Sequence, residues 1–417
     1  MAAYFPSFPS VSPVPPRLAF QYHSPEVIRM ELTTEQQSIL DGGDGPEMAL
    51  AMKTLVRYGE SFKAPRLVPI KSAHLTGSFA ISTFSGYYEL LDKLVTAGVK
   101  VKVPTTINPR PGYDFSMQNR LIAFRKQKHH EEQMAKLGVT ANYSCVCYHS
   151  ANVPEFGDIL GWAESSAVIF ANSVRGARTN RNSIMVDVCM AVTGLTPEFG
   201  LLYAENRKGT VLIKLDIDEM DDDALGFVVG QRVVDGIPVF THFPFNETSL
   251  KNLGATMAAA GGVGMFHVAG VTPECPNVEA VFDKDPEVWT VTQKDIDAVR
   301  YDRAKQDETG MVIFGCPQMT LDEINEVAPY FIGKKVAKRT LFHIVPHDYT
   351  QLMKLPLAEQ LIDAGVELHQ HCPLAAMSVR LNPKNRHILT NSGKLHYYLQ
   401  GAEYGNLEDV LRVAGVH

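Results

Sequence analysis

The 417-residue chain has few cysteines, little charge and no long hydrophobic run. Six cysteines are too few for a disulfide scaffold at this length, and in a reducing compartment thiols are more often buried, catalytic or bound to a metal. No window approaches the roughly 18 apolar residues that a transmembrane helix needs. The N-terminus also lacks the basic stretch and hydrophobic segment of a signal peptide. We therefore expect a cytoplasmic protein that does not bind a membrane.

Basic residues are scarce as well. Asp and Glu total 46 against 39 Lys and Arg, which gives a net charge of −7, and the longest basic stretch covers only residues 125–128. A nucleic-acid-binding surface needs a basic stripe that neutralises phosphates, so we expect no nucleic-acid partner. The chain is 45% apolar and 20% charged, which is typical of a well-packed globular protein. Its length predicts about three domains or one large α/β body.

The order of apolar and polar segments predicts an α/β fold with mostly parallel sheets, because short β-branched runs alternate with amphipathic stretches. Residues 1–28 are rich in proline, which blocks helix formation, so we expect a disordered tail outside the fold. The expected helices cover residues 46–58, 87–95, 117–137 and 321–330, and the expected strands cover 67–70, 99–103, 211–215, 311–314 and 366–368.

Polar residues follow four of these expected strands. In open α/β sheets, ligands bind beyond the carboxyl ends of the strands, so the four clusters could meet at one site. Any one cluster by itself is also what ordinary turns contain, but four together favour a site. The residues concerned are Lys71, Ser72, His74, Thr105, Thr106, Cys316 and Cys372.

Cys316 lies just before an expected helix. Thr320 and Glu323 form a Thr-x-x-Glu capping box, and the positive end of the helix that follows would stabilise a thiolate or a bound anion. Cys145 and Cys372 share with Cys316 a loop setting among small or turn-forming neighbours. These three cysteines are far apart in the sequence, unlike the closely spaced cysteine pairs of zinc fingers and ferredoxins. Such spacing is compatible either with a cluster bound between domains or with ordinary buried cysteines.

The densest polar patch covers residues 162–181. An arginine fork there could bind a substrate carboxylate in a bidentate manner, or could form surface salt bridges. Near the C-terminus, an Asn-Ser-Gly-Lys turn offers donors for an anion, although it is equally an ordinary turn. We expect the acidic run at 221–223 and the pair His129–His130 to be solvated. The patch and the turn contribute Glu164, Ser165, Ser166, Asn172, Arg178, Thr179, Ser392 and Lys394.

Several longer strings resemble the catalytic large subunit of aconitase X, from about residue 30 to the last residues. They are Ile-Lys-Ser-Ala-His, Val-Pro-Thr-Thr-Ile-Asn-Pro, Trp-Ala-Glu-Ser-Ser-Ala-Val-Ile-Phe-Ala-Asn-Ser-Val-Arg-Gly-Ala-Arg-Thr-Asn, Met-Phe-His-Val-Ala-Gly-Val-Thr-Pro-Glu, Phe-Gly-Cys-Pro-Gln and Thr-Asn-Ser-Gly-Lys. The resemblance implies that residues 29–417 form an aconitase-like body of about three α/β units around an iron–sulfur cluster.

The resemblance also implies which thiols bind the cluster. The family's ligands fall on Cys145, Cys316 and Cys372, and leave one iron open for the substrate hydroxyl. Cys147 and two other cysteines are then expected to be bystanders, namely Cys189 and Cys275. Structural zinc on Cys145 and Cys147 with a histidine is the alternative metal site.

The implied reaction is the dehydration of a hydroxy acid, so the protein is expected to be a hydro-lyase. An open iron would act as a Lewis acid on the hydroxyl while a base removes a proton from the adjacent carbon. The candidate catalytic residues are His74, Ser165 and Ser166. The candidate substrate-binding residues are Lys71, Ser72, Thr105, Thr106, Asn172, Arg178, Thr179, Ser392 and Lys394.

The expected substrate is cis-3-hydroxy-L-proline, with 5-phosphomevalonate as the alternative, because different strings resemble the two groups of the family. In aconitase-type enzymes the base is a serine of a small swivelling domain, and the chain after Tyr398 is too short to form it. We therefore expect a separate small subunit that supplies this serine. A different class of function is a redox-sensing or RNA-binding relative without enzymatic activity, although the acidic net charge argues against RNA.

Overall fold

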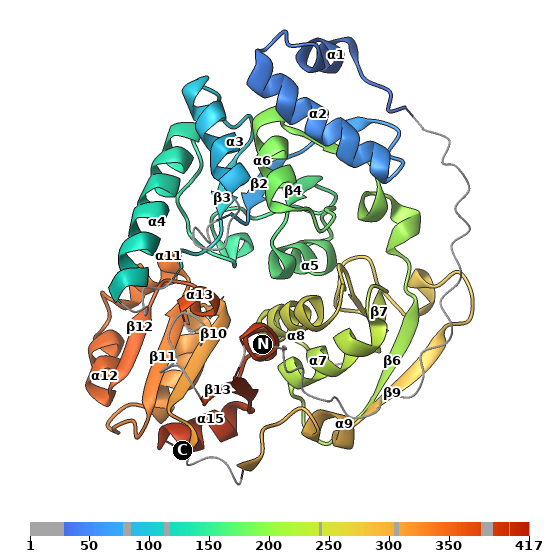
Figure 1. Cartoon of the computed structure of the whole chain (residues 1–417). Helices are drawn as coiled ribbons and strands as arrows, with labels where there is room; N and C mark the ends of the chain where they lie inside the picture. The colour runs from blue at the N-terminus through green and yellow to red at the C-terminus, as the bar shows by residue number, and fades with distance from the viewer. Residues whose placement is uncertain are drawn as a thin grey trace, which may run out of the picture.

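The computed structural model describes residues 29–77, 85–111, 117–241, 244–303, 308–376, 387–399 and 401–416. The predicted tail, residues 1–28, lies outside the described residues. Figure 1 shows three lobes that follow one another along the chain: the first at the top, the second at the right and the third at the lower left. A parallel sheet lies in each lobe, so the expected α/β class with mostly parallel sheets is confirmed.

The first lobe contains a parallel sheet of three short strands in the order β3-β2-β4. His74 of β2 lies opposite Thr106 of β3 and Trp162 of β4. A separate antiparallel pair joins β1 to β5. The strands are β1 (Leu67–Pro69), β2 (Ser72–Leu75), β3 (Thr105–Ile107), β4 (Leu160–Trp162) and β5 (Leu195–Pro197). The helices are α1 (Thr34–Leu40), α2 (Pro46–Ser61), α3 (Ser85–Thr96), α4 (Met117–Leu137), α5 (Ser165–Ser173) and α6 (Ile184–Thr193).

The expected strand at 99–103 does not form. The backbone N–H groups of Val101 and Lys102 donate to carbonyls of α4 and α6. The hydrogen bonds of this stretch are therefore made with two helices and not with a neighbouring strand. The ladder begins only after Pro104, which has no N–H to donate. Thr105 therefore begins β3 instead of following a strand. The expected strand at 67–70 is also different in the structure, because residues 67–75 form two short strands in two different sheets. Lys71 therefore lies between β1 and β2.

The second lobe contains a parallel sheet in the order β8-β7-β6-β9, with helices α7 and α8 packed closely together. Glycines allow this close approach: a Cβ atom on Gly226 would lie 2.7 Å from the Leu253 carbonyl oxygen. Helix α8 also packs against α5 of the first lobe. The elements are β6 (Val211–Asp216), α7 (Asp222–Val233), β7 (Pro238–Phe240), α8 (Glu247–Ala260), β8 (His267–Val268), β9 (Glu287–Thr292) and α9 (Gln293–Asp297).

The third lobe contains five parallel strands in the order β12-β11-β10-β13-β14. The pairing of β10 with β11 is irregular between Phe314 and Met319, where Gly315 has a φ of +94°. Cys316 and Gln318 lie in this irregular stretch. The strands are β10 (Met311–Met319), β11 (Arg339–Ile344), β12 (Val366–His369), β13 (Ile388–Thr390) and β14 (Ala402–Tyr404). The helices are α10 (Leu321–Val327), α11 (Pro346–Leu352), α12 (Pro356–Ala364), α13 (Pro373–Ala376), α14 (Gly393–Tyr398) and α15 (Leu407–Ala414).

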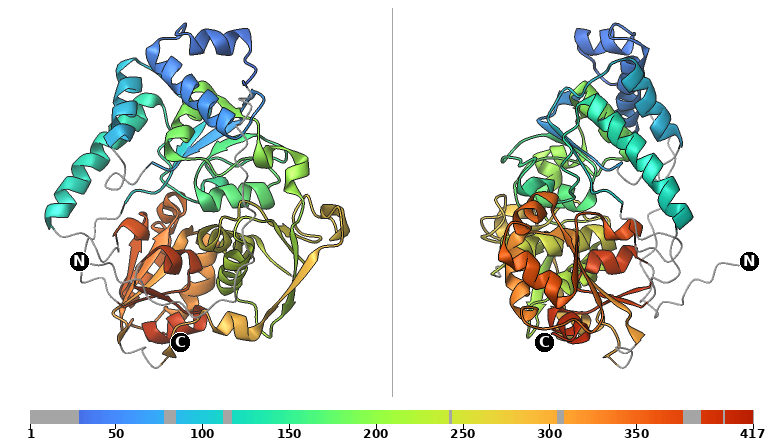
Figure 2. Two further views of the ribbon diagram at one scale, coloured as in Figure 1. Left: turned by 45° about the vertical axis from the view of Figure 1, so that its right-hand side comes forward. Right: turned by 90° about the vertical axis from the view of Figure 1, so that its left-hand side faces the viewer.

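Each lobe has a main hydrophobic core, and the core of the second lobe also includes Ile169 of α5 and Tyr404 of β14. Each lobe contributes its own cluster of buried apolar side chains. Figure 2 shows that α4 runs down one side of the molecule, from the first lobe towards the third. A β-bridge between Pro111 and Cys372 also joins these two lobes. The site described next lies where the lobes meet.

Candidate active site

Cys145, Cys316 and Cys372 come from three separate segments and interact where the first and third lobes meet. None of the six cysteines forms a disulfide bond in the described part of the chain. Burial raises the pKa of Cys316, the Lys394 ammonium lowers it, and the nearby thiols of Cys372 and Cys145 raise it further. The backbone N–H of Cys372 donates to the carbonyl of Arg110 at 2.8 Å, which fixes the third segment against the first lobe. The structure thus brings together the three thiols expected to bind a cluster.

Cys147 lies two residues from Cys145 but contacts a different part of the protein. Burial raises its pKa, and a hydrogen bond with the side chain of Thr106 on β3 lowers it. The Sγ atom of Cys145 instead lies 3.9 Å from Oε1 of Gln318 on β10, the strand that carries Cys316. Cys145 is therefore the thiol that contacts the strand of Cys316. The other two expected bystanders, Cys189 and Cys275, are buried in apolar clusters.

The donor set fits an iron–sulfur cluster better than a single metal ion. Among the described residues, no group of three or more His, Cys, Asp or Glu side chains is placed to hold one metal ion, so the zinc site considered from the sequence does not form there. In a cluster, cysteine thiolates bind separate iron atoms and surround a shared volume. Burial raises the pKa of Cys145, and the ammonium groups of Lys394 and Lys251 are among the groups that lower it. These cations can balance the negative charge of bound thiolates.

A buried ion pair adjoins the thiols. Lys394 Nζ donates to Glu164 Oε1 at 2.6 Å and to Ser166 Oγ at 2.8 Å, and Ser166 Oγ donates to Glu164 Oε2 at 2.7 Å. Burial alone would raise the pKa of Glu164, but the charge of Lys394 and the hydrogen bonds hold it below its usual value. Burial alone would likewise lower the pKa of Lys394, but Glu164 and the thiols of Cys316 and Cys145 raise it. Both partners are therefore charged.

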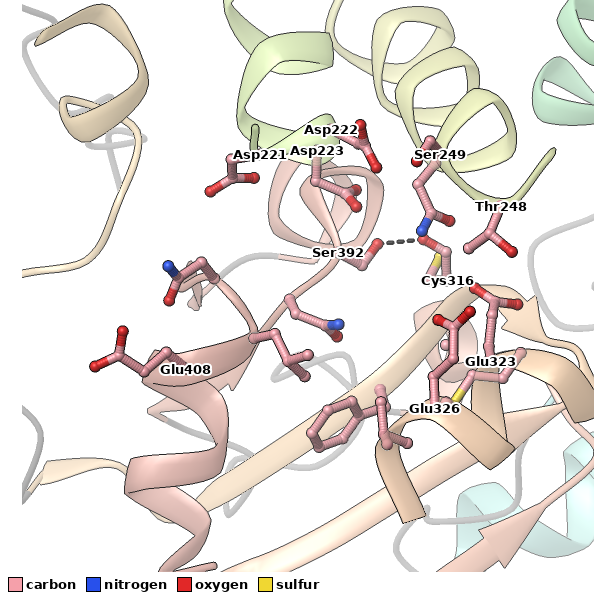
Figure 3. A pocket seen from close by; sticks show the side chains of 18 of the residues that line it. Asp221, Asp222, Asp223, Thr248, Ser249, Cys316, Glu323, Glu326, Ser392 and Glu408 are labelled. Atoms are coloured by element: carbon pink, nitrogen blue, oxygen red, sulfur yellow. Dashed lines mark hydrogen bonds between the residues drawn. The ribbon is translucent and has the colours of Figure 1, made fainter. Parts of the chain in front are cut away.

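Helix starts explain why these side chains converge. Glu164 caps α5, because its Oε2 accepts the Ala167 N–H at 2.6 Å. Ser392 caps α14 and also donates to the carbonyl of Cys316, as Figure 3 shows. The Ser392 cap holds the first turn of α14 beside β10, and Lys394 in that turn reaches the Glu164 cap of α5. The Ser165 hydroxyl makes only a long contact of 3.5 Å with Glu164.

A second buried ion pair approaches from the second lobe. Lys251 of α8 binds Glu323 and also donates to the Gln318 carbonyl at 3.3 Å. The expected capping box of α10 is confirmed, since Glu323 Oε2 accepts the Thr320 N–H at 2.8 Å and Thr320 caps the helix in return. Sequence reasoning missed Lys251 and Gln318. The signal for Lys251 was a lone lysine among the small and apolar residues of α8.

His74 lies next to this site in a closed arrangement. The ring is fully buried, with Nδ1 2.8 Å from Thr106 Oγ1 and Nε2 3.0 Å from Asn108 Oδ1. Because an amide oxygen only accepts, Nε2 carries the hydrogen and Nδ1 accepts from the Thr106 hydroxyl. Burial lowers the pKa of His74 to about 4, although the Asn108 hydrogen bond and the charge of Glu164 raise it. His74 is therefore neutral at pH 7, and its role in catalysis stays a prediction.

Three expected substrate-binding residues belong to another network instead. The Asn172 side chain donates to the carbonyls of Thr179 and Gly264, each at 2.9 Å, at the end of α5 away from the thiols. Arg178 Nη1 donates to the Leu202 carbonyl at 2.6 Å. These side chains bind backbone carbonyls, and the role of Asn172, Arg178 and Thr179 in substrate binding stays a prediction.

The structure also places three other expected residues away from the thiols. Lys71 is exposed, and Ser72 accepts a hydrogen bond from the Trp162 indole N–H at 3.2 Å. Thr105 donates to the Val103 carbonyl at 2.8 Å. Lys71 precedes β2, while Ser72 and Thr105 begin β2 and β3, so these residues come before His74 and Thr106 along the two strands.

The acidic run at 221–223 was wrongly expected to be solvated. Asp223 is buried because its Oδ1 accepts both the Thr256 hydroxyl and the Gly393 N–H at 2.7 Å. Burial raises the pKa of Asp223 to about 7. The run lines a cavity of about 560 Å³ that also reaches Cys316 and Ser392 (Figure 3). Asp223 thus holds the start of α14 from the second lobe.

The expectation for His129 and His130 was right for the first and wrong for the second. His129 is half exposed, whereas His130 is fully buried with its Nε2 3.2 Å from the Tyr87 hydroxyl.

Among the described residues, no helix has the length and hydrophobicity needed to cross a membrane.

Three consecutive family models match the three lobes. They are described as the aconitase X first domain (residues 29–205), second domain (209–301) and third domain (309–416). The fold is also similar to a crystal structure of Thermococcus kodakaraensis aconitase X in its holo form. The TM-score is 0.82 and the identity 31%, and the match covers 92% of this chain and 100% of that one.

Two curated relatives show the class of reaction. A phosphomevalonate dehydratase large subunit from Thermococcus kodakarensis is 35% identical over 91% of this chain and 98% of its own length. A cis-3-hydroxy-L-proline dehydratase from Pseudomonas aeruginosa is 30% identical over 72% of this chain and 54% of its own length. Both are named dehydratases, so the expected hydro-lyase class is confirmed. The matches to all three domain models and to these relatives show that the chain belongs to the aconitase X family.

Proposed function

We propose that this chain is the large subunit of a dehydratase that eliminates water from 5-phosphomevalonate. The relative with that name is similar over nearly its whole length, whereas the cis-3-hydroxy-L-proline dehydratase is matched over about half of its length. The comparisons thus favour the alternative substrate over cis-3-hydroxy-L-proline. The observation that carries the proposed site is the convergence of three thiols beside the buried Lys394–Glu164 pair.

Cys145, Cys316 and Cys372 are proposed to hold an iron–sulfur cluster. When bound, an iron with an open position supplies a Lewis acid that makes the substrate hydroxyl a better leaving group. The cysteines must lose their protons to bind iron, so cations nearby favour binding. Lys394 of α14 and Lys251 of α8 provide that positive charge, since both lower the pKa of Cys145.

The first turn of α5 is proposed to bind the substrate's anionic groups. Ser165 and Ser166 occupy this turn, and because the Glu164 carboxylate already caps its Ala167 N–H, the proposed contact is with the partly exposed Ser165 hydroxyl. Lys394 orients Ser166 and Glu164 by hydrogen bonds to both, and keeps the Glu164 carboxylate charged. Ser166 Oγ therefore has a fixed position beside the thiols.

The proposed enzyme needs a second chain. A relative that is similar over nearly its full length is named a large subunit, which supports a small-subunit partner. We propose that residues 29–417 form the large catalytic region and that the small subunit supplies the serine that acts as the base. Residues 1–28 are proposed to be a tail outside this region, and the cytoplasmic location stays a prediction.

The test is co-expression of this chain with a small subunit of the family, anaerobic purification, and assay of both substrates. We expect turnover of 5-phosphomevalonate that requires both chains and is much faster than turnover of cis-3-hydroxy-L-proline. Preference for cis-3-hydroxy-L-proline would contradict the proposal that 5-phosphomevalonate is the substrate. Full turnover by this chain alone would overturn the role of the partner.

A further inference from the structure

We propose that Gln318 is a positioning residue that fixes the spacing of the three cluster-binding thiols. The proposal rests on the proposed function, since it concerns the cluster that the three cysteines would hold. Gln318 lies two residues after Cys316 in the irregular stretch of β10, and its side chain is buried, with 1% of the residue exposed.

The Gln318 carboxamide contacts both of the other cysteine segments. Its Nε2 donates to the Gln370 carbonyl at 2.9 Å, and Gln370 lies two residues before Cys372. Its Oε1 lies 3.9 Å from the Cys145 thiol. One side chain thus connects the segments of Cys145 and Cys372, while its own backbone belongs to the segment of Cys316.

The Gln318 backbone adds a contact with the second lobe. Its carbonyl accepts a hydrogen bond from Lys251 Nζ at 3.3 Å, and Lys251 is fixed in turn by Glu323. Gln318 therefore touches the first lobe at Cys145, the second at Lys251 and the third at Gln370. A change in the packing of any lobe would be transmitted to the thiols through this residue.

A carboxamide makes both side-chain contacts at once without carrying a charge. The Gln370 carbonyl needs a donor, which orients the amide nitrogen, and the amide oxygen accepts from the Cys145 S–H until that thiol loses its proton to iron. An ionised glutamate has no donor for the carbonyl, so the variants are compared at alkaline pH, and a leucine has neither group. Hydrogen-bonding partners outside the ligand set hold metal ligands in place, and losing one typically costs about 10- to 100-fold in metal affinity or activity.

The test measures how long the cluster survives in the complex of both subunits. Wild type, Gln318→Glu and Gln318→Leu are reconstituted anaerobically, and iron per chain is measured before a chelator is added. The loss of the cluster's visible absorbance then gives its lifetime. Gln133→Leu is the matched control, because Gln133 is also buried but donates to Asp92 at 2.7 Å in the first lobe.

We expect both Gln318 variants to lose the cluster about tenfold faster than wild type, with Gln133→Leu unchanged. A residue with a merely structural role would lower thermal stability without shortening the cluster lifetime in folded protein. Gln318→Glu keeps the shape of the side chain and is the informative variant if Gln318→Leu does not fold. A wild-type lifetime in Gln318→Glu would overturn the role of Gln318 and leave the proposed function intact. A wild-type chain that binds no iron would overturn the proposed function, and this inference with it.

Discussion

The two ends of helix α5 hold different kinds of buried charge. At its start, Glu164 pairs with Lys394, and both side chains are at most 7% exposed. Beyond its end, Arg207 pairs with Glu274 and also donates to the backbone carbonyls of Asn172, Ala177 and Leu201. Both cations are buried, but the charge of Lys394 acts on the thiols of Cys316 and Cys145, whereas Arg207 is surrounded by carbonyls.

This difference distinguishes the proposed binding site at the start of α5 from the structural ion pair beyond its end. An arginine whose donors all bind carbonyls and one carboxylate has its hydrogen-bonding capacity used by the fold. A lysine held between a carboxylate and free thiols stabilises whatever negative charge those thiols acquire. What a buried cation faces is therefore more informative than its burial.

The largest effect is expected at the thiols themselves. In Cys316→Ser, a hard hydroxyl replaces a soft thiolate ligand, so the complex should lose bound iron and sulfide, and its turnover should fall below detection. Cys189→Ser is the control, because Cys189 is buried in the first-lobe core. Iron analysis and turnover would be measured on both variants. Full activity in Cys316→Ser would contradict the proposed ligand set.

A large loss of both activity and stability is expected at the start of α5. Lys394→Met leaves Glu164 buried without its partner, which should cost about 3–5 kcal/mol in the free energy of unfolding. Adding Glu164→Gln should restore most of the stability but not the turnover, since the cation beside the thiols is still missing. Urea denaturation and turnover would be compared in the single and double variants. Recovery of turnover in the double variant would show that Lys394 acts only in the fold.

At the other end of α5, a loss of stability alone is expected. Arg207→Met should cost a similar amount, about 3–5 kcal/mol, because it leaves Glu274 and several carbonyls without their donor. Turnover per iron-loaded chain should stay at the wild-type level at a temperature where the variant is folded. A marked fall in turnover per iron-loaded chain would show that Arg207, like Lys394, affects the reaction and not only stability.

The smallest expected effect is a pH dependence at His74. Its pKa in the folded protein is lowered to about 4 by burial, against an ordinary value of 6.5. As the pH falls below 6.5, the unfolded chain binds this proton and the folded chain does not until about pH 4, so stability decreases over that range. One such group changes the free energy of unfolding by at most about 1.4 kcal/mol per pH unit. His74→Gln should show a shallower decrease than wild type in urea denaturation between pH 6.5 and 4, and an equal slope would argue against a neutral buried ring.

The sequence predicted features that depend on local patterns. Helices such as α4 and the capping box of Thr320 follow from residue spacing within one segment. The strand expected at 99–103 does not form because the N–H groups of Val101 and Lys102 donate to carbonyls of α4 and α6 and not to a neighbouring strand. The resemblance to aconitase X, together with the loop settings, indicated the three thiols.

Features that depend on contacts between lobes were missed. Asp223 looked solvated because its partners, Thr256 and Gly393, are distant in sequence. Gln318 ends the Phe-Gly-Cys-Pro-Gln string that resembles aconitase X, but its role was missed because its contacts with Cys145 and Gln370 exist only in the folded chain. Such residues become visible only when the lobes are placed together.

The most direct test of the ligand assignment compares two neighbouring cysteines. Cys145→Ala and Cys147→Ala remove thiols two residues apart, and only the first of these thiols contacts Gln318 on the strand of Cys316. Iron and sulfide per chain would be measured after anaerobic reconstitution of wild type and both variants. We predict that wild type and Cys147→Ala bind the cluster and that Cys145→Ala does not. Loss of the cluster in Cys147→Ala with retention in Cys145→Ala would contradict the proposed site.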